Sequence, residues 1–82
     1  MRRTIALVAH DNKKDDLVEW VDFNKGTLAP HNLLATGGTG RKIIEKTGLG
    51  VTLLKDGSRG GDMEIGALIA NGELDYLIFF WD

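Results

Sequence analysis

The chain has 82 residues, which is enough for one domain and too few for two. It contains no cysteine, so disulfides and thiolate metal sites are excluded. The net charge is −2, whereas a nucleic-acid-binding protein normally carries a basic surplus. The apolar runs are too short to span a bilayer, and the first one breaks off too early for a signal peptide. We therefore expect one cytoplasmic domain over residues 1–82, with no nucleic-acid or membrane partner.

Four short apolar runs are typical of buried strands. They are Thr4–Ala9, Asn32–Ala35, Val51–Leu54 and Leu74–Trp81. Their hydrophobic residues are continuous rather than alternating, which favours strands that are covered on both faces. The aromatic residues Phe79, Phe80 and Trp81 are therefore expected to pack within the strand layer instead of binding a ligand.

Three segments with helical spacing of apolar residues alternate with these strands. They are Asp15–Leu28, Arg41–Lys46 and Asp62–Asn71. Apolar side chains on one face of each helix are expected to face the core, and they include Trp20, Phe23, Ile43, Ile44, Ile65, Leu68 and Ile69. Pro30 is expected to stop the first helix, and Asn71-Gly72 to cap the last. The order β-α-β-α-β-α-β predicts a three-layer α-β-α fold around a mostly parallel sheet.

Polar or glycine-rich sequence follows each predicted strand. These segments are His10-Asp11, Thr36–Gly40, Asp56–Asp62 and Asp82. In open α/β sheets, ligands bind outside the carboxyl ends of the strands. The sequence therefore predicts a ligand site along one edge of the sheet.

The glycine-rich segment Thr36–Gly40 permits two interpretations, a phosphate-binding loop or a simple tight turn. Its glycines would let backbone N–H groups approach an anion, and the following helix would present its N-terminus. Asp62 is likewise either a helix N-cap or a carboxylate base, and spacing alone favours the cap.

The polar residues after the first strand are also ambiguous. His10 and Asp11 could form a strand-end hydrogen-bonding pair, or Asp11 could polarise a substrate carbonyl or hydroxyl. Lys14 could be a solvated charge or a phosphate partner. His10 and His31 are far apart in sequence, so no metal site is expected.

Five segments, in this order, resemble methylglyoxal synthase. They are IALVAHD (5–11), ATGGTG (35–40), GGD (60–62), IGALI (65–69) and LIFFWD (77–82). The resemblance implies a methylglyoxal synthase-like, flavodoxin-like fold. It also implies conversion of dihydroxyacetone phosphate into methylglyoxal and phosphate through an enediolate, without a metal or cofactor.

The resemblance also implies roles for individual residues. Asp62 matches the catalytic base, and Asp11 and Asp82 match further active-site aspartates. The substrate- and phosphate-binding positions are His10, Lys14, Thr36, Gly37, Gly38, Thr39 and Gly57. The expected partner is a small phosphorylated substrate or inorganic phosphate.

Three departures from the family pattern lead to further expectations. Gly38 replaces a threonine of the usual TGTTG loop, and Asp56 replaces a serine, where a carboxylate should repel phosphate and Arg59 could offset the repulsion. The family's domain continues past residue 82 and there carries a catalytic histidine. We therefore expect a truncated, split or redesigned piece, for which a phosphate-binding or self-assembling module is the alternative function.

The family's strand order, 3-2-1-4-5, predicts an additional consequence of that shorter length. Without a fifth strand, Leu77–Trp81 would form an exposed hydrophobic edge. Such an edge tends to pair with another chain, so a homo-oligomer through this strand, or a partner that replaces the missing strand, is expected.

Overall fold

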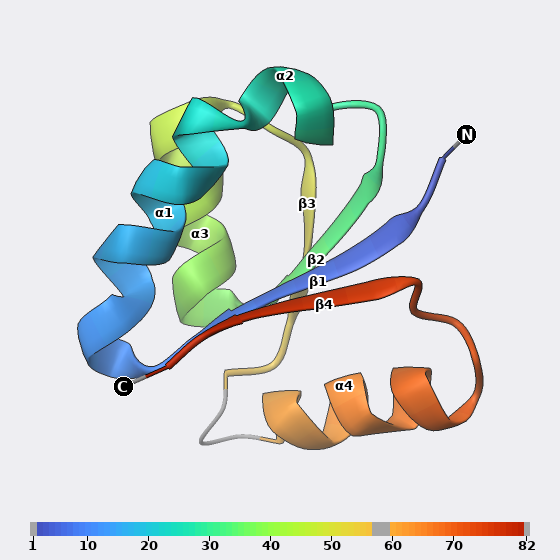
Figure 1. The fold of residues 1–82 in the computed structure, drawn as a ribbon. Helices are drawn as coiled ribbons and strands as arrows, with labels where there is room; N and C mark the ends of the chain where they lie inside the picture. The colour runs from blue at the N-terminus through green and yellow to red at the C-terminus, as the bar shows by residue number, and fades with distance from the viewer. Residues whose placement is uncertain (1, 57–59, 82) are drawn as a thin grey trace.

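The computed structural model describes residues 2–56 and 60–81, and it has three layers (Figure 1). The central layer is a sheet of four strands in the order β3-β2-β1-β4, and every neighbouring pair is parallel. The strands are β1 (Thr4–Ala9), β2 (Asn32–Thr36), β3 (Val51–Leu54) and β4 (Tyr76–Phe80). The predicted α/β class and parallel sheet are confirmed.

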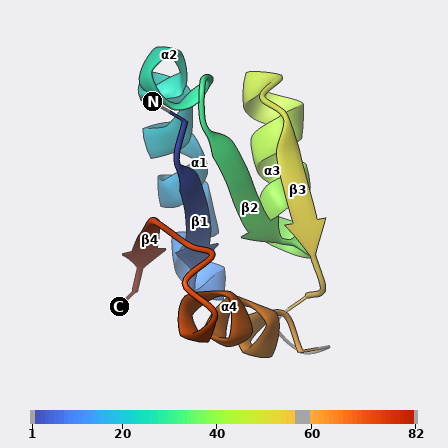
Figure 2. The ribbon, with the colours of Figure 1, turned by 90° about the vertical axis from the view of Figure 1, so that its right-hand side faces the viewer.

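Helices lie on both faces of this sheet. The helices α1 (Lys14–Phe23) and α3 (Gly37–Thr47) cover one face, and α4 (Gly61–Ala70) lies on the other (Figures 1 and 2). A short 3₁₀ helix over Asp11–Lys13 leads into α1. The single turn α2 (Lys25–Leu28) follows α1. Within the described ranges, no helix is long and apolar enough to cross a membrane.

The main core lies between the sheet and the α1–α3 pair. Leu7 at the centre of β1 is fully buried, as are Leu17 and Val21 on α1 and Ile43 on α3. Burying an aliphatic side chain of this size stabilises the fold by about 1.5–3 kcal/mol. These contacts hold α1 and α3 against the sheet, and they thereby position the N-terminus of each helix relative to the strands.

The first predicted helix is divided in two. α1 ends at Phe23, and the Asn24 backbone N–H and its side-chain amide both donate to the Trp20 carbonyl. Phe23 is 89% exposed, so the prediction that it packs in the core is wrong. It lies two residues from the buried Val21, and residues at that separation do not share a helix face.

The second helix begins four residues earlier than predicted. Gly37, not Arg41, is the first residue of α3, so the glycines that follow β2 form its first turn. Ile43 is buried as expected, but Ile44 is 37% exposed and the prediction for it is wrong. Ile44 directly follows Ile43, and adjacent residues of a helix point in different directions, so Ile44 turns away from the sheet.

The sheet face that carries α4 is only partly covered. Ile65 is buried, but Ile69 on the same helix is 51% exposed, which corrects the expected three-residue stripe. β4 is shorter than the predicted Leu74–Trp81 run, and Leu77, Phe79 and Trp81 are exposed. Leu77 and Phe79 lie on one face of β4, so the expectation that every strand is covered on both faces is wrong for this strand.

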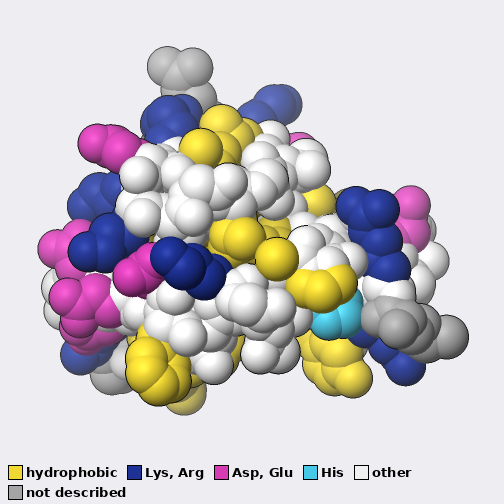
Figure 3. All heavy atoms as spheres, turned by 90° about the horizontal axis from the view of Figure 1, so that it is seen from above, with side chains coloured by type: hydrophobic (Ala, Val, Ile, Leu, Met, Phe, Trp, Pro, Cys, Tyr) yellow, Lys and Arg dark blue, Asp and Glu magenta, His cyan; other side chains and the backbone are white. Residues whose placement is uncertain are grey.

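The surface seen from above in Figure 3 carries both hydrophobic and charged side chains. Acidic and basic side chains gather at the left of that view, over α1, whereas hydrophobic side chains emerge in several separate groups. The charged face of α1 agrees with the acids and lysines of its sequence, Lys14–Phe23.

We expect Gly61→Ala to destabilise the fold, because a Cβ at this position would overlap the Lys55 carbonyl oxygen and lie 2.9 Å from Thr36 Cγ2. The free energy of unfolding should fall by about 1–3 kcal/mol, as is usual for overpacking. Gly66→Ala in the same helix is the matched control, since a Cβ there meets nothing within 4 Å. The control should gain about 0.5–1 kcal/mol. Urea denaturation measures both, and a Gly61→Ala variant as stable as the control would contradict the packing described.

Candidate functional site

Two helix N-termini meet beyond the carboxyl end of β2. α3 begins at Gly37, directly after the last residue of β2, Thr36. α4 begins at Gly61, whose lack of a side chain lets it lie against the Thr36 methyl group and the Lys55 carbonyl. The first N–H groups of a helix lack partners within the helix, and its dipole is positive at that end. The arrangement therefore favours negative charge at this edge of the sheet.

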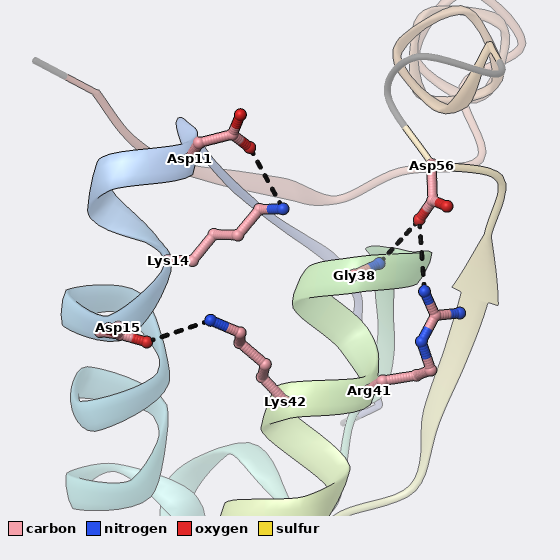
Figure 4. Close-up of polar contacts among 7 residues, drawn as sticks. All are labelled: Asp11, Lys14, Asp15, Gly38, Arg41, Lys42 and Asp56. Carbon is pink, nitrogen blue, oxygen red and sulfur yellow. Dashed lines mark hydrogen bonds and ion pairs between the residues drawn. The ribbon is translucent and has the colours of Figure 1, made fainter.

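Asp56 joins both helix starts to the end of β3 (Figure 4). Its Oδ1 accepts a hydrogen bond from the Gly38 backbone N–H at an N···O distance of 2.8 Å. The same oxygen lies 3.6 Å from Arg41 Nη2. The Asp56 backbone carbonyl accepts from the Gly61 N–H at 3.0 Å. Asp56 thus supplies one hydrogen-bond acceptor to the first turn of α3 and a second acceptor to the first turn of α4.

Lys14 brings a second cation to the start of α3. Its Nζ lies 3.2 Å from Asp11 Oδ1, and a Cβ built on Gly38 would be 3.1 Å from that Nζ. The Lys14 side chain is 26% exposed, whereas that of Asp11 is 99% exposed. The ammonium group therefore stands beside the glycine turn, and its carboxylate partner is free to move into solvent.

His10 lies at the same sheet edge but on the side of β4. Its ring packs edge-on against Phe79, with the ring centroids 5.5 Å apart and the planes at 76°. Its backbone N–H donates to the Phe80 carbonyl at 3.0 Å. The ring and the backbone N–H of His10 thus both contact β4, and these contacts hold the ring at the rim of the site.

The two threonines of the glycine segment are buried. Thr36 is 8% exposed and Thr39 is fully buried. The Thr39 hydroxyl finds no hydrogen-bond partner among the described residues. The hydroxyl is therefore an unsatisfied donor next to Gly38. Leaving a buried hydroxyl unpaired costs about 1–3 kcal/mol.

The structure thus brings together six of the residues singled out from sequence, namely Asp11, Lys14, Thr36, Gly37, Gly38 and Thr39. Gly57 and Asp82 lie outside the described residues. Asp62 is the second residue of α4, whose N-cap position is occupied by Gly60. The interpretation of Asp62 as the N-cap is therefore wrong, and its role as a base stays a prediction.

Sequence reasoning missed Arg41 as the described partner of the Asp56 carboxylate. Arg41 was assigned only to the start of a helix, yet it lies one turn after Gly37 and faces Asp56. The signal was present in the glycine segment, since helical continuation from Gly37 places residue 41 above it. Asp56 was expected only to repel phosphate, with Arg59 as compensation, but Arg59 lies outside the described residues. The cation that the structure places beside Asp56 is Arg41.

No group of three or more His, Asp or Glu side chains within residues 2–56 and 60–81 lies close enough to hold a metal ion. The donors gathered at the sheet edge are instead N–H groups and cations. This set is suited to an anion.

Comparisons with known proteins agree on one family. The sequence profile of the MGS-like domain matches residues 16–82. The chain is 56% identical over 82 residues to the methylglyoxal synthase of Pseudoalteromonas atlantica, and 55% identical over 78 residues to that of Moorella thermoacetica. The crystal structure of methylglyoxal synthase from Elizabethkingia anophelis NUHP1 matches with a TM-score of 0.95 and 54% sequence identity.

These matches cover nearly all of this chain but only part of the relatives. The alignments include 100% and 95% of this chain for the two bacterial relatives, and 61% of each of them. The solved structure matches 99% of this chain and 53% of its own length. The chain thus spans between about half and three fifths of these relatives.

We expect Thr39→Val to leave the free energy of unfolding unchanged or to raise it by about 1 kcal/mol, because the valine removes a buried hydroxyl that has no described partner. Thr47→Val is the matched control on the same helix. The Thr47 hydroxyl donates to the Ile43 carbonyl at 2.6 Å and accepts from the Leu49 N–H at 3.1 Å. Its loss should cost about 1–2 kcal/mol. Equal destabilisation in urea by both variants would show that the Thr39 hydroxyl has a structural partner.

Proposed function

Because the chain belongs to the methylglyoxal synthase family, we propose that its strand-end site acts on dihydroxyacetone phosphate as a lyase and releases methylglyoxal and inorganic phosphate. The observation that carries this proposal is that the Lys14 ammonium and the Arg41 guanidinium both lie beside the Gly37-Gly38 turn, whose Gly38 N–H already donates a hydrogen bond to a carboxylate. A site that holds one anion in this way has the chemistry to hold a phosphate group.

The phosphate group of the substrate would take its hydrogen bonds from the first turn of α3. Gly37 and Gly38 offer backbone N–H groups, Thr36 and Thr39 offer hydroxyls, and Lys14 offers a positive charge. Gly57 belongs to the same predicted set. His10, at the rim beside Phe79, would contact the remainder of the substrate.

In the proposed reaction, the Asp62 carboxylate removes a proton from the carbon beside the ketone and an enediolate forms. The electron pair then expels phosphate as the C–O bond breaks, and the resulting enol tautomerises to methylglyoxal. Cations and N–H groups near the developing negative charge lower the barrier. Asp11 and Asp82 are proposed to orient the substrate oxygens, and no cofactor takes part.

The test is to incubate the purified chain with dihydroxyacetone phosphate and to measure methylglyoxal and phosphate release together. Asp62→Asn keeps the shape of the side chain but removes the base, so turnover should fall by about 100-fold or more. Asp22→Asn at the far end of α1 removes the same charge away from the site and should leave the rate unchanged. Equal rates for Asp62→Asn and the unchanged chain would contradict the assignment of the base.

A phosphate-binding module without turnover is the second candidate function. One observation favours it, namely the Asp56 carboxylate in the glycine turn. The same assay separates the candidates. Release of methylglyoxal supports the lyase, whereas phosphate binding without product supports the module.

We also propose that two copies of the chain associate through β4. Among the described residues this strand pairs only with β1, and Leu77 and Phe79 on one of its faces are exposed. An exposed apolar edge strand offers unpaired N–H and C=O groups to a second strand. A second copy would bury both the backbone groups and the apolar side chains.

Sedimentation velocity over a range of concentrations tests this association. The unchanged chain should form a dimer or larger assembly, and Leu77→Lys should weaken it by about tenfold or more, because a charge on an edge opposes pairing. Phe23→Lys, at an exposed apolar position on α1, is the control and should leave association unchanged. A stable monomer at high concentration would contradict the proposal.

A further inference from the structure

The Asp56 carboxylate occupies the position that an anionic ligand would need at the start of α3. Its Oδ1 takes the Gly38 N–H at 2.8 Å and faces Arg41 at 3.6 Å. A Cβ on Gly37 would lie only 2.6 Å from the same oxygen. No room therefore remains between the glycine turn and the carboxylate for a second anion.

We propose that Asp56 is a built-in competitor of phosphate, whose carboxylate must leave the Gly38 N–H before a phosphate group can bind there. This inference rests on the proposed function, because it concerns the regulation of the same phosphate site. It makes Asp56 a specificity-determining residue. The site admits an anion only when that anion binds the α3 turn and the two cations more strongly than a tethered carboxylate does.

Two features make the exchange physically feasible. First, the Asp56 side chain is 43% exposed, so a path into solvent exists for the displaced carboxylate. Second, the backbone of Asp56 is held separately, since its carbonyl accepts from the Gly61 N–H. A rotation of the side chain can therefore vacate the glycine turn while the start of α4 stays in place.

The competitor acts through both geometry and charge. Phosphate and carboxylate cannot both accept the single Gly38 N–H. In addition, two anions a few ångströms apart repel each other more strongly near protein than in bulk water. Because Asp56 is part of the chain, its local concentration is fixed, and it competes with a bound anion at every anion concentration.

Two substitutions separate these contributions. Asp56→Ser removes the carboxylate and leaves the turn open, whereas Asp56→Asn keeps an acceptor oxygen for Gly38 but removes the charge. Asp15→Asn is the matched control, because Asp15 also pairs with a cation on α3, Lys42, at 3.3 Å, but does not contact the glycine turn (Figure 4). Circular dichroism confirms that each variant is folded.

The experiment is calorimetric titration of the four proteins with inorganic phosphate, with the Gly38 amide followed by NMR. We expect Asp56→Ser to lower the Kd for phosphate by about tenfold or more, which corresponds to about 1.4 kcal/mol. Asp56→Asn should give a smaller gain, and Asp15→Asn should match the unchanged chain. In the unchanged chain, phosphate should shift the Gly38 amide resonance as the carboxylate is displaced.

The contrary results are distinct. If the unchanged chain binds phosphate at Gly38 and Asp56→Ser binds it equally or more weakly, the competitor proposal is overturned and the proposed function stands. If neither the unchanged chain nor Asp56→Ser binds phosphate, both are overturned, because opening the turn should create binding. Should Asp56→Ser fail to fold, Asp56→Asn and the Gly38 shift in the unchanged chain decide the question. The proposal would be overturned if the Gly38 amide shift did not saturate with phosphate concentration. It would also be overturned if Asp56→Asn did not bind phosphate more tightly than the unchanged chain.

Discussion

The contact between Asp56 and the two helix starts is the interaction on which the strand-end site depends. Its side chain satisfies Gly38 of α3 and its backbone carbonyl satisfies Gly61 of α4. These helices lie on opposite faces of the sheet, so the residue connects the two outer layers at one edge. Without these two hydrogen bonds, the Gly38 and Gly61 N–H groups would need other acceptors, either water or a bound anion.

The same constraint explains the small residues around the site. Gly61 has no space for a Cβ against the Lys55 carbonyl, and a Cβ at Gly37 would displace the Asp56 carboxylate from its present position. Glycine here permits close approach of backbone to backbone or of backbone to an acidic side chain. Glycine at these two positions thus serves the packing of the strand-end segments.

Much of the fold follows from the sequence because it is encoded locally. Thr4–Ala9 and Val51–Leu54 are strands with the predicted bounds, since a short run of apolar residues without helical spacing has few other solutions. Helix bounds were less predictable. The periodicity of Asp15–Leu28 did not reveal the break at Asn24, which depends on hydrogen bonds back to Trp20. Phe23 and Ile44 were placed in the core because hydrophobicity alone does not specify a helix face.

The site was predictable as a location but not as a set of contacts. Parallel strands bring their carboxyl ends to one edge, so the glycine segment and Asp56 could be placed together from order alone. The bond between Gly38 and Asp56 joins residues 18 apart in sequence, and its geometry depends on α3 beginning at Gly37. The acid that the sequence predicts to repel phosphate is, in the structure, the acceptor of the Gly38 N–H and the partner of Arg41.

The central claim is that this edge is an anion site with its own carboxylate in place. A crystal structure of the chain grown with inorganic phosphate tests it most directly. The account predicts a phosphate oxygen within hydrogen-bond distance of the Gly38 nitrogen, near Lys14 and Arg41, with the Asp56 carboxylate turned away. Phosphate bound elsewhere, with the Gly38–Asp56 hydrogen bond intact, would contradict it.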